Sequence, residues 1–306
     1  MSRYVIWLEW PEKCFRACGR DMALFRSLVP ARSEVKRVRS ERAFIKALKT
    51  ATHAVTWSFK AEWYALAPRL KVVATPAAGR ELVAPPPQGT GVKVHFGAYH
   101  GEIISESVAA FVLAWARGFF LPEMRSFWPR TEISGKCRTV SGTRAVVAGY
   151  GHVGRKIGEK LSALGVEVSW FGRKNLAGLP QAMRSADWFV MALPGTPETE
   201  NFLDAKKLAL LPRRAVVVNV GRGGCVDEEA LLAALKSGSI AGAYLDVCKN
   251  EPTASFSRRS GKESRIIALA RKGTLPANIV LTPHSSAFSP DYIARSFMEM
   301  KNEGVV

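Results

Sequence analysis

Short apolar runs alternate with stretches of helical periodicity over the second half of the chain. Apolar runs of this length, bounded by glycine, proline or polar residues, are typical of buried parallel strands. They cover residues 145–148, 166–171, 188–193, 215–220, 241–247 and 279–281. Stretches with helical spacing lie between them, at residues 153–164, 204–211 and 227–236. This alternation predicts a doubly wound α/β domain, in which ligands gather at the carboxyl ends of the parallel strands.

Residues before about position 100 predict a second, smaller α/β domain. Its expected elements are a helix at 21–29 and strands at 4–8, 70–74 and 91–94. The stretch 32–49 is rich in Lys and Arg, which we interpret as a solvated helix face rather than a nucleic-acid patch. A long helix is expected at 104–120, and its aromatic side chains favour burial between domains or in a subunit interface.

A glycine motif marks the first turn of the larger domain. Gly149, Gly151 and Gly154 follow the run 145–148 with G-x-G-x-x-G spacing. The first glycine permits a tight turn, the second lets the backbone approach a pyrophosphate, and the third lets helix and strand pack closely. The motif therefore predicts a dinucleotide whose pyrophosphate binds at the start of the following helix.

The end of the next strand indicates which dinucleotide binds. An NAD site has an acidic side chain about 20 residues past the glycines, where it meets the ribose hydroxyls. This chain has Gly172, Arg173 and Lys174 there, which leave room for a 2′-phosphate and can neutralise it. An ordinary solvated basic turn is the alternative. We expect NADP(H) rather than NAD(H).

The composition of the chain favours an anionic ligand and gives no sign of a nucleic-acid or membrane partner. The 306 residues suit two domains, and the net charge of +18 attracts anions. No DNA- or RNA-binding signature accompanies the charge, and no stretch approaches the ~20 apolar residues of a membrane span, so neither partner is expected. The five cysteines lack metal-ligand spacing, which predicts no metal site and favours a reducing cytoplasm.

Three polar side chains fall just past expected strand ends, at Arg222, Glu251 and His284. Taken singly, they suit a surface cation, a residue that starts a helix and a core histidine. Together they lie where a doubly wound sheet exposes reactive groups.

In these blocks the sequence resembles the D-isomer-specific 2-hydroxyacid dehydrogenases over most of residues 65–300. Besides the glycine motif, the resemblance rests on Ala-Asp-Trp-Phe-Val-Met-Ala-Leu-Pro-Gly-Thr-Pro-Glu-Thr at 186–199 and on the long block 215–252. It implies a Rossmann dinucleotide-binding domain at 103–284 and a smaller flavodoxin-like substrate domain formed by 1–102 with 285–306. It also implies a homodimer, with 111–128 as the region expected at the interface.

The resemblance implies a role for each of the three polar residues. His284 would be the general acid–base, Glu251 would orient it and raise its pKa, and Arg222 would bind the substrate carboxylate. Ala78 and Gly79 would offer backbone N–H groups to the substrate. The residues expected at the cofactor are Gly149, Gly151, His152, Val153, Gly154, Gly172, Arg173, Lys174, Leu193, Pro194, Thr199, Val220, Gly221 and Asp246, with Asp246 on the nicotinamide carboxamide.

Several features depart from the family pattern. His152 replaces a common arginine, and the segment 95–102 lacks the usual substrate-side form, so Tyr99 and His100 could touch substrate or pack under the hinge. The chain ends at Val306, before the family's usual return segment, so we expect it to be trimmed or incomplete. Residues 253–277 are expected to form a basic inserted loop with a helical stretch at 266–270.

The expected activity is NADPH-dependent reduction of a small 2-ketoacid such as glyoxylate or hydroxypyruvate. A bulkier or phosphorylated hydroxyacid is one alternative. A dinucleotide-sensing regulatory protein on the same fold is the other, although a pure sensor has no need of Arg222, Glu251 and His284.

Overall fold

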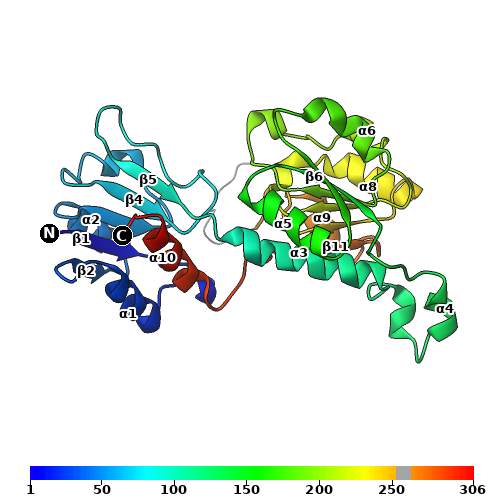
Figure 1. The fold of residues 1–306 in the computed structure, drawn as a ribbon, viewed down its shortest axis with the longest axis horizontal. Helices are drawn as coiled ribbons and strands as arrows, with labels where there is room; N and C mark the ends of the chain where they lie inside the picture. The colour runs from blue at the N-terminus through cyan, green and yellow to red at the C-terminus, as the bar shows by residue number, and fades with distance from the viewer. Residues whose placement is uncertain (253–262) are drawn as a thin grey trace. The chain divides into compact units, whose positions relative to one another are not determined.

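The computed structural model describes residues 1–252 and 263–306, which form two compact units (Figure 1). One unit comprises Met1–His100 with Phe288–Val306, and the other comprises Gly101–Ala287. Each contains one parallel sheet with helices on both faces, so both expected doubly wound α/β domains are confirmed. The assignment of the first unit to substrate and the second to dinucleotide stays a prediction.

The first unit has a five-stranded sheet in flavodoxin-like order. Its strands, listed across the sheet, are β2 (Glu34–Arg37), β1 (Arg3–Trp7), β3 (His53–Thr56), β4 (Val72–Thr75) and β5 (Lys93–Phe96). On one face, Tyr4 of β1 contacts Phe25 of α1 (Gly19–Leu28), which packs edge-on against Phe297 of α10 (Tyr292–Asn302). On the other face, Val5 packs against Phe44 of α2 (Glu41–Leu48). Neighbouring residues of one strand thus serve opposite layers.

The second unit has a six-stranded sheet whose strand order reverses beside the glycine motif. Listed across the sheet, the strands are β11 (Ile279–Leu281), β10 (Gly242–Leu245), β9 (Val216–Asn219), β8 (Trp188–Met191), β6 (Arg144–Ala148) and β7 (Glu167–Phe171). The chain passes from β6 to β7 on one side and then returns to β8 on the other. Such a switch point leaves a crevice at the carboxyl ends, where dinucleotides bind.

Two hydrophobic layers cover the faces of this second sheet. Val147 belongs to the layer under α3 (His100–Ala116) and α5 (His152–Ala163). Its neighbour Val146 belongs to the layer on the other face, which packs on the remaining helices. These are α6 (Leu179–Met183), α7 (Ala205–Leu208), α8 (Glu228–Ser237) and α9 (Arg265–Arg271), while the short α4 (Arg130–Ser134) buries no residue. Both layers are continuous and apolar, as a sheet buried on two faces requires.

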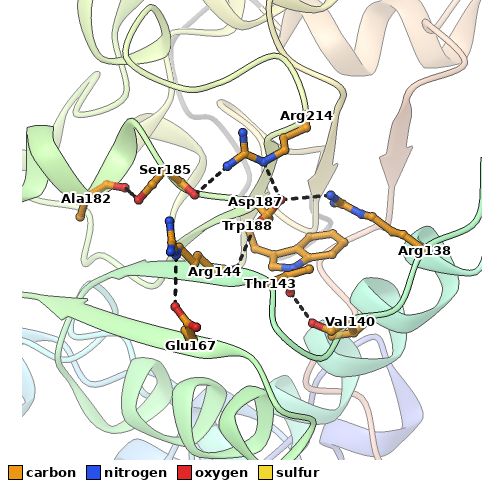
Figure 2. Close-up of polar contacts among 10 residues, drawn as sticks. All are labelled: Arg138, Val140, Thr143, Arg144, Glu167, Ala182, Ser185, Asp187, Trp188 and Arg214. Carbon is orange, nitrogen blue, oxygen red and sulfur yellow. Dashed lines mark hydrogen bonds and ion pairs between the residues drawn. The ribbon is translucent and has the colours of Figure 1, made fainter.

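An ion cluster joins the amino ends of β6, β8 and β9 (Figure 2). The Asp187 carboxylate, before β8, accepts from Arg138 Nη1 at 3.1 Å and Arg214 Nε at 2.9 Å. It also accepts from the backbone N–H of Arg144, at the start of β6, at 2.9 Å. The Arg138 guanidinium lies over the Trp188 ring, 4.7 Å from its centroid. One nearly buried carboxylate thereby fixes the amino edge of the sheet.

Some expected boundaries were wrong. The charged stretch 32–49 contains the edge strand β2 before its helix, because edge-strand side chains alternate between solvent and sheet. The helix expected at 104–120 begins at His100 and ends at Ala116, because Gly118 adopts φ +77° and turns the chain. Strand β3 was not expected, since four residues give little periodicity. Within 253–277, residues 253–262 lie outside the described part, and α9 covers the expected helical stretch.

Among the residues that the structure describes, none of the helices has the length and apolar character needed to cross a membrane.

Candidate active site

The turn after β6 is tight at its first and third glycines and open at its second. Gly149 has φ +113°, and a Cβ there would lie 2.4 Å from the carbonyl oxygen of Ala192. A Cβ on Gly154 would lie 1.9 Å from the carbonyl oxygen of Gly149. A Cβ on Gly151 would meet nothing within 4 Å, so space remains at the start of α5. This geometry fits a dinucleotide pyrophosphate.

A pocket of about 450 Å³ opens at the carboxyl end of β7. Its lining residues are Tyr150, Trp170, Gly172, Arg173, Lys174 and Asn175. The Asn175 side chain shapes the turn, because its Oδ1 accepts from Gly172 N–H at 2.7 Å and its Nδ2 donates to Trp170 O at 2.8 Å. The pocket therefore brings together two cations, two aromatic faces and a residue without a side chain. Such a lining suits an adenosine with a phosphate on its ribose.

Arg222 follows β9 in a turn that packs closely on its neighbours. Asn219 fixes this turn by donating from Nδ2 to Arg222 O at 3.0 Å and accepting from Gly221 N–H at 3.2 Å. The stem of Arg222 lies 3.1 Å from a Cβ placed on Gly195, in the loop after β8. A Cβ on Gly223 would lie 1.9 Å from the carbonyl carbon of Cys248, so the Arg222 turn touches the loop after β10.

Glu251 and His284 meet between the loops that follow β10 and β11. The imidazole Nδ1 of His284 lies 2.8 Å from Glu251 Oε2, while Glu251 Oε1 accepts from Cys248 N–H at 2.9 Å. Because a carboxylate oxygen can only accept a hydrogen bond, Nδ1 carries the proton in this contact. His284 itself has φ +52°, an uncommon backbone conformation that marks many functional residues.

Asp246 organises the loop that carries His284. Its buried carboxylate accepts from Thr282 Oγ1 at 2.6 Å, from the N–H groups of Ser285 and Ser286, and from Ser286 Oγ. Its backbone carbonyl accepts from His284 N–H at 2.8 Å. This role was not expected from the sequence, and the expected contact with the nicotinamide carboxamide stays a prediction.

The charges around His284 raise the pKa of its imidazole. Burial alone would lower this pKa, but the hydrogen bond and charge of Glu251, together with the charge of Asp246, outweigh burial. Arg222 opposes them and lies close enough for its charge to lower the pKa of His284. One arginine, one imidazole and one orienting carboxylate therefore converge at the carboxyl edge of the second sheet.

The other expected residues fall into two groups. Ala78 and Gly79 belong to the first unit, as do Tyr99 and His100; His100 is buried, with Nε2 2.7 Å from the hydroxyl of Tyr292. The rest surround the edge just described: His152 and Val153 begin α5, Leu193, Pro194 and Thr199 follow β8, and Val220 and Gly221 follow β9. The sequence reasoning missed the following residues: Tyr150, Trp170, Asn175, Asn219, Thr282, Ser285 and Ser286. Only Asn175, as an Asn in a turn, gave a local signal.

Comparison with known proteins identifies the family. The model for the NAD binding domain of the D-isomer specific 2-hydroxyacid dehydrogenases matches residues 110–286. The chain belongs to the D-isomer specific 2-hydroxyacid dehydrogenase family. The resemblance drawn from the sequence blocks is thereby confirmed.

Individual dehydrogenases of the family differ in how much they share with this chain. The glycerate dehydrogenase of Methylorubrum extorquens is 31% identical over 230 residues, 71% of this chain and 69% of that protein. A putative D-3-phosphoglycerate dehydrogenase of Schizosaccharomyces pombe is 30% identical over 210 residues, 63% of this chain but 44% of that longer protein. The solved NADPH-dependent glyoxylate/hydroxypyruvate reductase of Sinorhizobium meliloti superposes with a TM-score of 0.73, covering 100% of this chain and 94% of that one, at 24% identity.

We expect the imidazole of His284 to titrate above its ordinary pKa of about 6.5 and Glu251→Gln to lower that pKa. The sign follows from the charge of Glu251, which favours the protonated imidazole. A raised folded-state pKa also means that His284 stabilises the fold at low pH and loses this contribution as pH rises through that pKa. The measurement is an NMR titration of the five histidines, assigned with His284→Asn. Glu167→Gln, at the opposite edge, is the control and should leave the curve unchanged.

Proposed function

We propose that this dehydrogenase reduces small 2-ketoacids, of the glyoxylate and hydroxypyruvate type, to D-2-hydroxyacids with a preference for NADPH. The observation that carries the proposal is the contact of 2.8 Å between His284 Nδ1 and Glu251 Oε2, beside the Arg222 turn. This contact supports a proton donor held at the carboxyl edge of a dinucleotide-binding sheet.

Each side chain has a distinct task in the proposed reaction. A bound nicotinamide supplies the hydride. His284 donates its Nε2 proton to the carbonyl oxygen, and Glu251 holds Nδ1–H and stabilises the imidazolium before transfer. Arg222 binds the substrate carboxylate through its guanidinium and polarises the keto group. The raised pKa of His284 favours the protonated form of the donor.

The NADPH preference is supported by the pocket after β7. Arg173 and Lys174 line it, and Gly172 places no acidic side chain where a 2′-phosphate would lie. A Cβ on Gly172 would approach Tyr150 to 3.2 Å, so even a small side chain would narrow the pocket. The Sinorhizobium meliloti enzyme, which was solved with NADP, lends the same support by likeness.

We expect His284→Ala to lower kcat for ketoacid reduction about 100- to 10,000-fold, because the proton donor is lost. The measurement is NADPH oxidation with glyoxylate, hydroxypyruvate and, for the phosphorylated alternative, 3-phosphohydroxypyruvate. Quenching of tryptophan fluorescence by NADPH should persist, since Trp170 lines the expected cofactor pocket. Full activity of His284→Ala with any of these acids would contradict the proposed role.

The double variant Arg173→Ala/Lys174→Ala should raise KM for NADPH about 10- to 100-fold and leave KM for NADH nearly unchanged. The reason is that a hydrogen bond to a charged phosphate is worth ~1.5–3 kcal/mol. Arg184→Ala, an exposed arginine at the end of α6, is the matched control for charge. Equal losses with both cofactors, or a wild-type preference for NADH, would refute the selectivity.

We also propose a homodimer that covers the apolar segment after α3. Phe127 is 99% exposed, Trp128 78% and Phe119 63%, which is unusual for a surface in water. Light scattering after gel filtration should give twice the chain mass of 33.5 kDa for the wild type. Phe127→Ser/Trp128→Ser should shift the mass toward the monomer, whereas Met298→Ser, on α10, should not. An unchanged mass in the double variant would place the interface elsewhere.

A further inference from the structure

We propose that Glu228, at the first position of α8, is a positioning residue that holds Glu251 in register with His284. As far as turnover is concerned, this inference rests on the proposed function. Its geometric part does not, because it concerns only how one loop of the second unit is held.

The carboxylate of Glu228 is buried and fully engaged. Glu228 is 7% exposed to solvent. Its carboxylate oxygens accept hydrogen bonds from Lys249 N–H at 3.0 Å, Ser264 Oγ at 2.8 Å and Arg265 N–H at 2.9 Å. A buried carboxylate is costly unless such donors surround it. Lys249 lies in the loop after β10, and Ser264 and Arg265 lie at the start of α9. The side chain of Glu228 therefore connects these two segments.

Lys249 lies in the turn that shapes Glu251. The turn runs from Cys248, whose N–H donates to Glu251 Oε1, through Asn250 at φ +47° to Glu251 itself. The side chain of Lys249 contacts Asn201 Oδ1 at 2.7 Å, which holds the turn from the side of the loop after β8. The backbone N–H of Lys249 donates a hydrogen bond to Glu228 Oε1. A shift of this amide therefore moves the carboxylate that faces His284.

Reach rather than charge is the property of Glu228 that matters for this arrangement. The charged groups that face His284 are Glu251, Asp246 and Arg222. None of the hydrogen bonds that Glu228 makes within residues 1–252 and 263–306 extends to His284. Burial raises the pKa of the Cys248 thiol, in the turn between them, and the charge of Glu228 raises this pKa further. The effect of Glu228 on the imidazole thus passes through the position of Glu251.

Two substitutions separate reach from charge. Glu228→Asp keeps the charge but withdraws the carboxylate by one methylene from Lys249 N–H. Glu228→Gln keeps the length and one oxygen that can accept from Lys249 N–H, but it removes the charge and the bond from Arg265 N–H. Glu229→Gln, at the next and exposed position, is the control for charge on α8.

The experiment is the NMR titration of His284 in the four proteins, without any substrate. We expect Glu228→Asp to lower the pKa of His284 toward its value in Glu251→Gln, while Glu228→Gln and Glu229→Gln stay near the wild type. An unchanged His284 titration in a folded Glu228→Asp would overturn the proposal, as would a shift in Glu228→Gln without one in Glu228→Asp. Both substitutions are conservative, and Glu228→Ala, which removes the carboxylate altogether, should lower the pKa of His284 as well.

Turnover provides the second readout. Ketoacid reduction by Glu228→Asp should fall about 10- to 100-fold in kcat at neutral pH, a loss of the size that follows removal of a hydrogen-bond partner behind a metal-binding histidine. The pH above which the rate declines should move lower, with KM for the ketoacid little changed. If the wild type reduces no ketoacid, the proposed function fails while the titration still decides the role of Glu228. A loss of kcat with an unshifted pH profile would mean a structural role alone and would overturn the inference.

Discussion

Backbone lies against backbone where the strands of the second sheet end, and the candidate site depends on that contact. The turn after β6 meets the loop after β8 through Gly149, and the turn after β9 meets the loop after β10 through Gly223. At both positions a single methyl group would collide with a carbonyl, so the loops can approach only where no side chain intervenes. This approach brings Arg222, Glu251 and His284 to one edge although they come from three separate strand ends.

The two edges of the same sheet are built differently. At the amino edge, Asp187 joins strands through charged hydrogen bonds to Arg138 and Arg214, with little exposure to solvent (Figure 2). At the carboxyl ends of the strands, Asp246 accepts from two hydroxyl groups and two backbone N–H groups, and Glu251 accepts from one backbone N–H and one imidazole. The carboxylates at the two ends of the strands are thus held by different donors, which are guanidinium groups at the amino ends and backbone, hydroxyl and imidazole groups at the carboxyl ends.

The features that could be predicted from the sequence are those encoded by residues close together along the chain. The glycine turn, the alternation of strands and helices, and the order of Arg222, Glu251 and His284 are all local patterns. The edge strand β2 was hidden because its charged residues suit a helix surface equally well. The hydrogen bonds of Asp246 and Glu228 were invisible because their partners lie 21 to 40 residues away, and no periodicity reports such distances.

The backbone of His284 has a left-handed conformation, which costs conformational energy in a residue other than glycine. At φ +52° most residues have a less favourable backbone energy than glycine. The hydrogen bond from His284 N–H to the Asp246 carbonyl holds the backbone in this conformation. The backbone conformation alone would therefore favour glycine at this position. Glycine would relieve that strain but would leave Glu251 Oε2 without its contact to the imidazole, so the backbone and the side chain of this residue have opposite effects on stability.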